Sequence, residues 1–333
     1  MLQEFDCIVV GAGPSGLAAA IFLRVDGWST LILEKGDVGG QAGMAYIVSN
    51  YLGFPPGPSD ILVDNMFKQL TKPPPEGLGA QLKTETVTKL DVDNKIVYTD
   101  KDSYKAKAIL LATGSNMQKL NVPGEEKFLG KGVTYNAKKD LEHFTNKKVV
   151  VIGGGNSAID AAVLAKTKTN DVKLVHRREI LRANFLPRKR LERANIEVLY
   201  NKDVVEIRGD EKVHSIVLRD VKTKEESVLP VDWVVIAIGT VPNIELAKQA
   251  GLELSNGYVK INENFMTSKE GIFACGEIAG SDQHILTAAA HGALAGMAIS
   301  RYLALEKLKR GENLPGAVAG KYPEEYMEML KKS

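Results

Sequence analysis

The 333-residue sequence is poor in cysteine, carries almost no net charge and contains no apolar run long enough to span a bilayer. Its two cysteines, Cys7 and Cys275, cannot form a disulfide scaffold or a four-cysteine metal site. A formal net charge of +2 gives no compositional reason to expect binding to nucleic acid. We therefore expect a globular protein of a reducing compartment, the cytoplasm, with no metal site and no membrane or nucleic-acid partner.

The sequence does contain two glycine fingerprints, each between a strand-like run and a helix-like run. The first follows the apolar run Cys7–Val10 and reads Gly11-Ala12-Gly13-Pro14-Ser15-Gly16. The second follows Val149–Ile152 and reads Gly153-Gly154-Gly155-Asn156-Ser157-Ala158. Glycines at these positions let the backbone approach a pyrophosphate, and the N-terminus of the following helix stabilises its negative charge. The sequence therefore predicts two dinucleotide-binding sites.

The residues around the fingerprints form two similar series of alternating strands and helices, which is typical of parallel sheets covered by helices. More strand-like and helix-like runs follow the second series, so we expect both ends of the chain to build one domain. The predicted fold class is α/β, with two Rossmann-like domains of the three-layer ββα type and the second inserted in the first. The expected domains are residues 1–116 with 245–333, and residues 117–244.

Four later segments have a predicted secondary structure. Leu252–Ile261 and Gly271–Gly276 are expected to be strands that join a sheet. Thr287–Leu305 is expected to form a long helix, and Pro323–Lys332 a short one. Both cysteines lie in apolar runs, so we expect them to be buried.

The strands after the two fingerprints end in residues of opposite charge. The first ends at Glu34, whose carboxylate suits a ribose diol and repels a 2′-phosphate, so this site is expected to hold FAD or NAD and not NADP. The second ends at His176-Arg177-Arg178, with Arg182 one turn later. Guanidinium groups bind a phosphate monoester well, so NADPH is favoured over NADH. The alternative is a solvated basic surface, because the charge continues in Arg188, Lys189, Arg190 and Arg193.

The order of four further motifs resembles that of thioredoxin-reductase-like flavoproteins. The motifs are Gly39-Gly40-Gln41, Asn50-Tyr51-Leu52-Gly53-Phe54-Pro55, Ala112-Thr113-Gly114 and Gly271-Ile272-Phe273-Ala274-Cys275-Gly276-Glu277. The run from His176 to Ala183 is also similar to the NADPH signature of that family. The resemblance covers most of the chain and implies FAD in the first domain, NADPH in the second, and a homodimer.

The resemblance also implies which residues bind each cofactor. For FAD they are Gly11, Gly13, Pro14, Ser15, Gly16, Glu34, Lys35, Gly40, Gln41, Tyr46, Asn50, Val87, Ala112, Thr113, Gly114, Gly276, Glu277, His284 and Ile285. For NADPH they are Gly153, Gly155, Asn156, Ser157, Ala158, His176, Arg177, Arg178 and Arg182. Glu277 stands where the family usually has Asp. Tyr46 and His284 are the candidate neighbours of the flavin ring.

The redox-active cysteines of the family are missing. Thioredoxin reductases of this build have a Cys-x-x-Cys-Asp segment before the second fingerprint, where this chain reads Tyr135-Asn136-Ala137-Lys138-Lys139-Asp140. Asn136 and Lys139 fill the two cysteine positions and cannot form a thiolate or a mixed disulfide. The chain therefore resembles the disulfide-free branch, the ferredoxin–NADP reductases of this type. That resemblance implies a ferredoxin-like acidic electron carrier as partner. Four lysines would add a basic surface for it, namely Lys138, Lys139, Lys147 and Lys148.

Three alternatives stay open at this point. The protein could be an NAD(P)H oxidase, or a reductase of free flavins, quinones or disulfide compounds. It could reduce thioredoxin through Cys7 and Cys275 if the fold brings the two together. It could also be a flavin-bound redox sensor without catalytic activity, since the lost dithiol permits that role.

Overall fold

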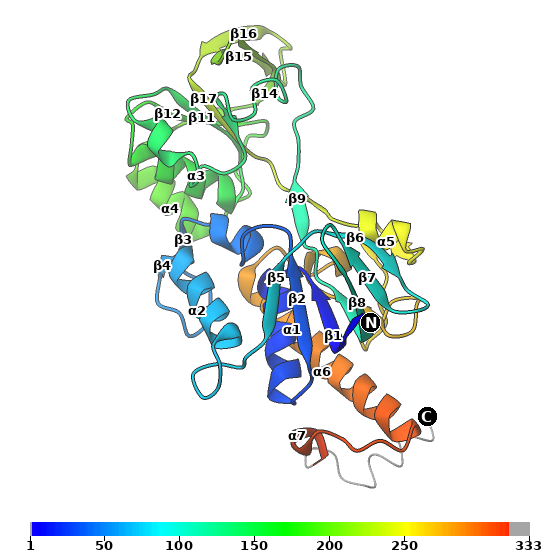
Figure 1. Ribbon diagram of the computed structural model, residues 1–333. Coiled ribbons are helices and arrows are strands. Elements are labelled where there is room, and N and C mark those ends of the chain that lie inside the picture. Colours follow the sequence, from blue (N-terminus) through cyan, green and yellow to red (C-terminus); the bar gives the residue numbers. More distant parts are fainter. Residues whose placement is uncertain (1, 320–333) are drawn as a thin grey trace. The chain divides into compact units, whose positions relative to one another are not determined.

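The computed structural model describes residues 2–319, and in it the chain forms two compact units (Figure 1). The first unit comprises the chain up to Gly43, Ser49–Ser115 and the chain from Pro242 onward. The second comprises Met44–Val48 and Asn116–Val241, so it is inserted in the first. The boundaries expected from the sequence fall slightly later at both junctions, and they leave Met44–Val48 in the first domain.

The first unit is built on a seven-stranded sheet in the order β5-β2-β1-β8-β7-β6, with β21 paired to β8. The bounds are β1 (Gln3–Val10), β2 (Thr30–Glu34), β5 (Gln81–Thr84), β6 (Val87–Asp91), β7 (Ile96–Thr99), β8 (Ser103–Leu111) and β21 (Ile272–Ala274). β1, β2, β5, β8 and β21 run parallel, whereas β6, β7 and β8 form an antiparallel meander. The carboxyl ends of the parallel strands therefore meet at one edge, where ligands of such sheets bind.

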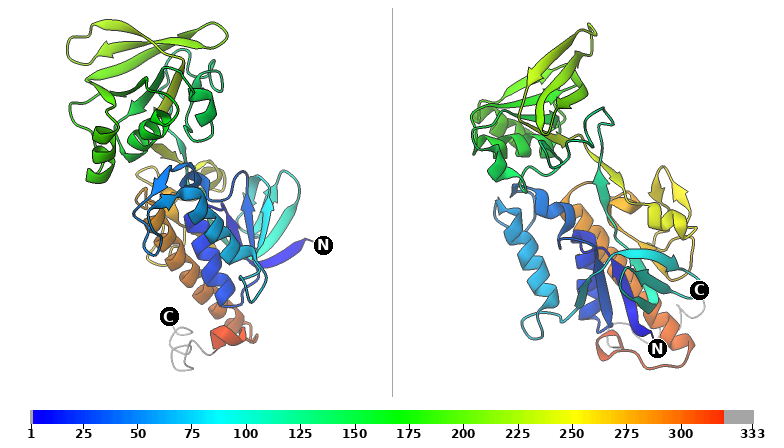
Figure 2. Two further views of the ribbon diagram at one scale, coloured as in Figure 1. Left: turned by 90° about the vertical axis from the view of Figure 1, so that its left-hand side faces the viewer. Right: turned by 45° about the horizontal axis from the view of Figure 1, so that its top comes forward.

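Helices cover one face of this sheet and the meander covers the other, so the unit has three layers (Figure 1). α1 (Pro14–Val25) and α6 (Ile285–Lys309) pack side by side on the helical face, as Figure 2 also shows. On the other face, apolar side chains of the parallel strands, among them Ile8 and Ile109, pack against Val97 of the meander. This is the ββα arrangement expected from the sequence.

The close contact between α1 and α6 depends on two glycines of α6. A Cβ atom on Gly292 would lie 1.9 Å from the carbonyl oxygen of Ser15, and one on Gly296 would lie 2.6 Å from that of Ala19. Any side chain at either position would push the two helices apart. The contact therefore holds the start of α1, which follows the first glycine fingerprint, against α6.

The second unit repeats the three layers around a five-stranded parallel sheet in the order β10-β17-β11-β12-β13. The bounds are β10 (Val133–Thr134), β11 (Val149–Gly153), β12 (Val172–His176), β13 (Glu197–Tyr200) and β17 (Trp233–Ala237). One face is covered by α3 (Asn156–Lys166) and α4 (Phe185–Arg193), and the other by the antiparallel strands β14 (Lys202–Gly209), β15 (Val213–Asp220) and β16 (Glu226–Pro230). The second glycine turn and the arginine run, which follow β11 and β12, thus lie at the same edge of the sheet.

The remaining elements are short, apart from α2. They are α2 (Ser59–Thr71), α5 (Glu245–Gln249), α7 (Gly316–Ala319), β3 (Ile47–Val48), β4 (Gly57–Pro58), β9 (Ser115–Met117), β18 (Thr240–Pro242), β19 (Leu254–Ser255) and β20 (Tyr258–Val259). β9 and β18 pair with each other. The two segments that connect the units therefore run as a two-stranded ribbon.

The sequence predictions for the later segments are partly wrong. Leu252–Ile261 does not join the large sheet: it holds only β19 and β20, which pair with each other. The turn residues Asn256 and Gly257 have φ of +51° and +82°, so the chain folds back at once into a surface hairpin. The segment Gly271–Gly276 does join it, as β21, and α6 confirms the long helix. The short helix expected over Pro323–Lys332 lies outside the described residues.

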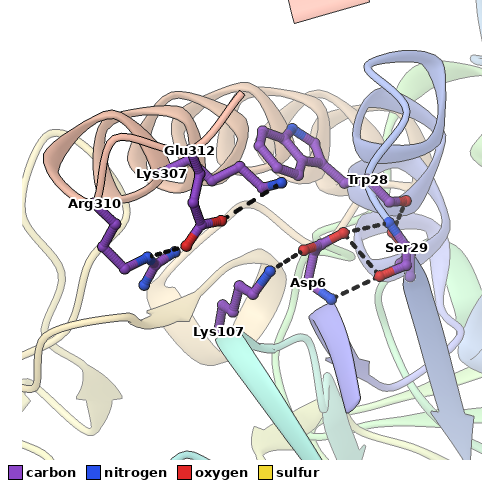
Figure 3. Close-up of polar contacts among 8 residues, drawn as sticks. Asp6, Trp28, Ser29, Lys107, Lys307, Arg310 and Glu312 are labelled. Carbon is purple, nitrogen blue, oxygen red and sulfur yellow. Dashed lines mark hydrogen bonds and ion pairs between the residues drawn. The ribbon is translucent and has the colours of Figure 1, made fainter. Parts of the chain in front are cut away.

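A polar cluster fastens the amino-terminal end of the first sheet (Figure 3). Asp6 of β1 accepts hydrogen bonds from the backbone N–H and hydroxyl of Ser29, at 2.9 and 2.8 Å, and forms an ion pair of 2.9 Å with Lys107 of β8. Burial raises the pKa of Asp6, but the bonds from Lys107 and Ser29 outweigh it, so the pKa lies below its usual value. Beside it, Lys307 of α6 lies 5.9 Å from the centre of the Trp28 ring.

Replacement of Asp6 by Asn is expected to lower the free energy of unfolding by about 1–2 kcal/mol at pH 7. The carboxyl has a lower pKa in the folded than in the unfolded chain. Its contribution is therefore complete above the unfolded pKa, near about 4, and is lost as the pH falls through the folded pKa. Urea unfolding at pH 7, 5 and 3.5 should show the difference shrink only at the lowest pH. Asp93→Asn, at a carboxylate whose side chain is 82% exposed, is the control and should change little. A difference for Asp6→Asn that is equal at all three values would contradict the assignment.

Candidate functional site

The first glycine turn follows β1 and leads directly into α1. Gly11 has φ +109°, and a Cβ there would lie 2.4 Å from the carbonyl oxygen of Ala112. Gly13 is the N-cap of α1, no side chain caps this helix end, and a Cβ on Gly13 would meet nothing within 4 Å. The space beside Gly13 is therefore open, and a pyrophosphate placed there could be bound by N–H groups of the first turn. A Cβ on Gly16 would lie 2.0 Å from the carbonyl oxygen of Gly11, so this glycine closes the turn instead.

Glu34 lies at the carboxyl end of β2, beside this turn. Its two carboxylate oxygens accept the N–H groups of Ala12 at 2.7 Å and Gly36 at 2.9 Å. A carboxylate has lone pairs beyond these two bonds, so Glu34 can also accept hydrogen bonds from a ribose. The backbone N–H of Glu85 donates to the carbonyl of Glu34 at 2.9 Å, which brings the start of β6, Val87, to the same edge.

Three residues from distant segments form one hydrogen-bonded network. The side-chain amide of Gln41 donates to the carbonyl oxygen of Ser115 at 2.6 Å and to its hydroxyl at 2.7 Å. The hydroxyl of Ser115 in turn donates to the carboxylate of Glu277. Gln41 and Glu277 were both expected at the FAD site, and the fold brings them together. Sequence reasoning missed Ser115, whose only signal is that it directly follows Ala112-Thr113-Gly114.

Gly276 and Gly40 lie against the same glycine turn. Gly276 has φ +76°, and a Cβ on it would lie 2.5 Å from the hydroxyl of Ser15. A Cβ on Gly40 would lie 3.7 Å from the Cα of Gly13. The N–H of Gly276 donates to Nδ1 of His291 at 2.9 Å. His291 is the second residue of this region that sequence reasoning missed.

The other residues expected around FAD are less closely connected. Asn50 and Lys35 are exposed, as is His284, which precedes the first residue of α6, Ile285. The hydroxyl of Thr113 donates to the carbonyl of Asn243 at 2.9 Å, next to the connecting ribbon of β9 and β18.

Tyr46 belongs to the segment Met44–Val48 that clusters with the second unit. Its ring packs, partly buried, against the apolar core of that unit. Its expected position beside the flavin ring stays a prediction.

The second glycine turn has the same construction as the first. Gly153 has φ +148°, and a Cβ on it would lie 2.2 Å from the carbonyl oxygen of Ala237. Gly155 is the N-cap of α3, which no side chain caps, and a Cβ on Gly155 would meet nothing within 4 Å. The side-chain oxygen of Asn156 accepts the N–H of Asn184 at 2.8 Å and so joins α3 to the loop after β12. This turn, too, offers room and N–H donors for a pyrophosphate.

His176, at the end of β12, packs against the second glycine turn and the loop after β12. It is 5% exposed, and a Cβ on Gly154 would lie 2.3 Å from its ring. Its Nε2 lies 3.1 Å from the carbonyl oxygen of Ile180. Burial lowers the pKa of His176, so the ring is neutral near pH 7. The neutral ring therefore has a packing role, and the positive charge of this loop comes from the arginines that follow His176.

Arg177, Arg178 and Arg182 differ from most of the basic residues that follow them. All three are exposed, and none forms an ion pair with a residue that the structure describes. Of the later residues, Arg190 pairs with Asp160 at 3.4 Å and Lys189 with Glu192 at 2.7 Å. Arg193 is exposed and, like the three arginines, has no ion-pair partner among the described residues.

Arg188, which we had counted in a solvated basic surface, has a structural role instead, because its side chain donates to the carbonyls of Leu181 and Ala183. It thereby holds the loop after β12 in shape.

The segment Tyr135–Asp140, where the resemblance led us to expect a dithiol, is stabilised by its own polar contacts. The side-chain oxygen of Asn136 accepts the N–H groups of Lys138 at 3.1 Å and Lys139 at 3.2 Å. The hydroxyl of Tyr135 donates to Glu125 at 2.6 Å. Burial, together with the carboxylate of Glu125, raises the pKa of Tyr135. Asn136 thus closes a turn, which is a structural role.

The two cysteines are both buried and free, as expected. Burial raises the pKa of Cys275 to about 12 and raises that of Cys7 well above its usual value. Because the thiolate is the reactive form, neither thiol is a nucleophile near pH 7.

The four lysines expected to form a basic surface lie at two ends of the second sheet. Lys147 and Lys148 precede β11, whereas the glycine turn follows it. Lys138 and Lys139 follow β10, which is parallel to β17 and hence to β11. Lys147 and Lys148 therefore lie at the edge opposite the second glycine turn. Lys138 and Lys139 lie in the segment after β10, whose last residue, Thr134, pairs with Val235 in the middle of β17.

Comparison with known proteins agrees with this construction over nearly the whole chain. The model of the pyridine nucleotide-disulphide oxidoreductase family matches residues 5–292. A thioredoxin reductase of Treponema pallidum is 38% identical over 308 residues, which cover 91% of this chain and 98% of the relative. A Clostridium pasteurianum protein described as a 34.2 kDa protein in the rubredoxin operon is 32% identical over 90% of this chain and 98% of its own length. The crystal structure of Lactococcus lactis thioredoxin reductase, 32% identical, matches with a TM-score of 0.84 and covers 90% of this chain and 99% of that one.

Among the described residues no helix is long and apolar enough to cross a membrane. The two glycine turns, the carboxylate after β2 and the matches along the chain point to one family. The chain belongs to the pyridine nucleotide-disulphide oxidoreductases and, among them, to the thioredoxin-reductase-like flavoproteins, whose two Rossmann-like domains bind FAD and a nicotinamide nucleotide.

Proposed function

We propose that this enzyme transfers electrons between NADP(H) and a small one-electron carrier of the ferredoxin type, with no dithiol between the flavin and the carrier. The observation that carries the proposal is the segment that replaces the dithiol. Asn136 closes a turn through its side-chain oxygen, and Lys139 is exposed. Neither residue can be reduced and reoxidised as a pair of cysteines can. Cys7 and Cys275 cannot replace the dithiol, because both thiols are buried and burial raises the pKa of each, which disfavours the reactive thiolate.

The first unit has residues that fit FAD. Gly13 and the uncapped first turn of α1 would hold its pyrophosphate, and Glu34 a ribose. Gln41 and Glu277, joined through Ser115, would contact the part nearer the flavin ring. Bound FAD supplies the redox chemistry, since a flavin takes up two electrons as a hydride and can release them singly. No side chain then needs to act as a general acid.

The second unit has residues that fit NADPH better than NADH. Gly155 and the uncapped first turn of α3 would hold the pyrophosphate. Arg177, Arg178 and Arg182 are exposed and have no ion-pair partner among the described residues, so they are available to a 2′-phosphate. The strand before them ends at His176, whereas β2 of the first unit ends at Glu34, a carboxylate that would repel such a phosphate.

The carrier is inferred from chemistry and from one relative. An acceptor of single electrons fits a flavin enzyme without a dithiol. The relative named for the rubredoxin operon, by its name, is encoded beside a small redox carrier. Lys138 and Lys139, in the segment after β10, would favour an acidic carrier. We propose a homodimer as the assembly.

A second candidate function is favoured by the names of the relatives. The Treponema pallidum relative is a thioredoxin reductase, so a disulfide compound, a quinone or a free flavin is the alternative acceptor. Each would have to receive its electrons without a protein dithiol.

An anaerobic acceptor screen with NADPH distinguishes the two. Ferredoxin with cytochrome c as final acceptor is compared with thioredoxin, a quinone, free FMN and no carrier. We expect ferredoxin to raise the rate of cytochrome reduction by about tenfold or more over NADPH alone. The reason is that ferredoxin carries electrons from the reduced flavin to cytochrome c. A rate equal to that without ferredoxin would remove the first proposal. Fast reduction of a quinone or a disulfide would support the second, and a flavin that NADPH does not bleach would contradict both.

A further inference from the structure

The turn Gly276–Ala279, which carries Glu277, is supported from α6 by an imidazole. The N–H of Gly276 donates to Nδ1 of His291 at 2.9 Å. Because Nδ1 is the acceptor, the hydrogen of the neutral ring lies on Nε2. Burial lowers the pKa of His291, which keeps the ring in this neutral form near pH 7.

The orientation of the His291 ring is held by a residue in an unusual backbone conformation. The ring of Phe265 meets it edge to face, with centroids 4.7 Å apart and an interplanar angle of 69°. Phe265 has φ +62°, a region that bulky residues rarely adopt and that often marks a functional site. Its N–H donates to the carbonyl of Asn262, and its carbonyl accepts the N–H of Ala274 of β21, both at 3.0 Å. The strained residue is thus fixed on both sides and presents its ring to His291.

The turn that His291 supports also contacts α1 and the Ser115 network. Gly276 has φ +76° and lies against Ser15, the second residue of α1. The carboxylate of the next residue, Glu277, accepts from Ser115, which also accepts from Gln41. His291 is therefore one end of a chain of contacts that reaches Gln41, and every later member except Ser115 is a residue expected at the FAD site.

We propose that His291 is a positioning residue for FAD. Its neutral ring, oriented by Phe265, accepts the N–H of Gly276 and so fixes the position of the Gly276–Glu277 backbone. This in turn positions the Glu277 carboxylate relative to FAD. The inference rests on the placement of FAD in the first unit and is independent of the electron acceptor.

The test compares three variants of the FAD-loaded enzyme. His291→Leu keeps the approximate size of the side chain but removes the acceptor. His291→Asn keeps an acceptor atom at the same distance from the backbone. His214→Leu is the control, at a histidine on an exposed part of β15 in the second unit. The readouts are the rate of FAD release, followed by FAD fluorescence after dilution, and the melting temperature in saturating FAD.

We expect His291→Leu to release FAD about tenfold faster or more, because the Gly276 N–H loses its partner. His291→Asn and His214→Leu should stay within about threefold of the native rate. The melting temperature of His291→Leu in saturating FAD should fall by no more than about 3 °C.

Native release from His291→Leu, or equal losses in His291→Leu and His291→Asn, would overturn the proposal. So would a loss explained wholly by a lower melting temperature. Purified native protein without FAD would overturn the placement of the cofactor as well. Failure of the ferredoxin assay would leave this inference intact.

Discussion

Replacement of Arg177 and Arg178 together by alanine is expected to raise the KM for NADPH by about 100-fold and to leave the KM for NADH within about threefold. The two guanidinium groups lie exposed after β12 and have no ion-pair partner among the described residues, so their removal leaves no buried charge unpaired. A bond from arginine to phosphate is charge-assisted and is lost only for the nucleotide that has a 2′-phosphate. Steady-state kinetics with both nucleotides and one artificial acceptor measure the effect.

Arg193→Ala is the matched control for this prediction. Arg193 is exposed at the end of α4, in the basic run that continues after Arg182. Its loss changes the charge of the same unit but removes no residue expected at the 2′-phosphate, so KM for NADPH should change by less than about threefold. An equal rise in KM for NADPH and for NADH in the double variant would show that the arginines do not bind the 2′-phosphate.

Replacement of Gly155 by alanine is expected to lower kcat/KM for NADPH about 30-fold without unfolding the protein. Gly155 has φ −94°, which any residue adopts, and a Cβ on it meets no protein atom within 4 Å. The added methyl group would instead occupy the space that we assign to the pyrophosphate. The FAD content and the melting temperature should stay close to those of the native enzyme.

Gly153→Ala, in the same turn, is expected to lower stability, whereas Gly155→Ala is expected to lower activity. Gly153 has φ +148°, and its Cβ would lie 2.2 Å from the carbonyl oxygen of Ala237, so this variant should lose about 3 kcal/mol of stability or more. Thermal unfolding separates the two variants. A stable Gly155→Ala enzyme with native kcat/KM would show that no pyrophosphate binds at this helix end.

The features that could be predicted from the sequence are those that are encoded in short, continuous segments. Both glycine turns, the carboxylate Glu34 and the three layers follow from runs of fewer than about twenty residues. The burial of Cys7 and Cys275 followed from the apolar runs around them and is confirmed.

The features that could not be predicted depend on contacts between distant segments. Ser115 is 162 residues away from its partner Glu277, and nothing in the local sequence shows the pairing. His291 lies in an alanine-rich helix, where its role becomes visible only through the contact with Gly276. Leu252–Ile261 has the alternation of a strand, but Asn256 and Gly257 fold it back before it can reach the sheet.

The segment Tyr135–Asp140 keeps its shape through its own polar contacts. Asn136 closes the turn with hydrogen bonds to two backbone N–H groups, and Tyr135 is tied to Glu125. The side chains of Asn136 and Tyr135 thus have partners, so the segment does not need cysteines to keep its shape.

The claim that electrons pass to an outside carrier without a sulfur relay is tested most directly in a cysteine-free enzyme. The variant Cys7→Ala with Cys275→Ala contains no thiol at all, since the chain has only these two cysteines. Its NADPH-dependent, ferredoxin-mediated reduction of cytochrome c is compared with that of the native enzyme at equal FAD content. We predict at least about half of the native rate, allowing for small packing changes at two buried sites. Loss of ferredoxin-mediated electron transfer in this variant, with FAD bound and still bleached by NADPH, would contradict the claim.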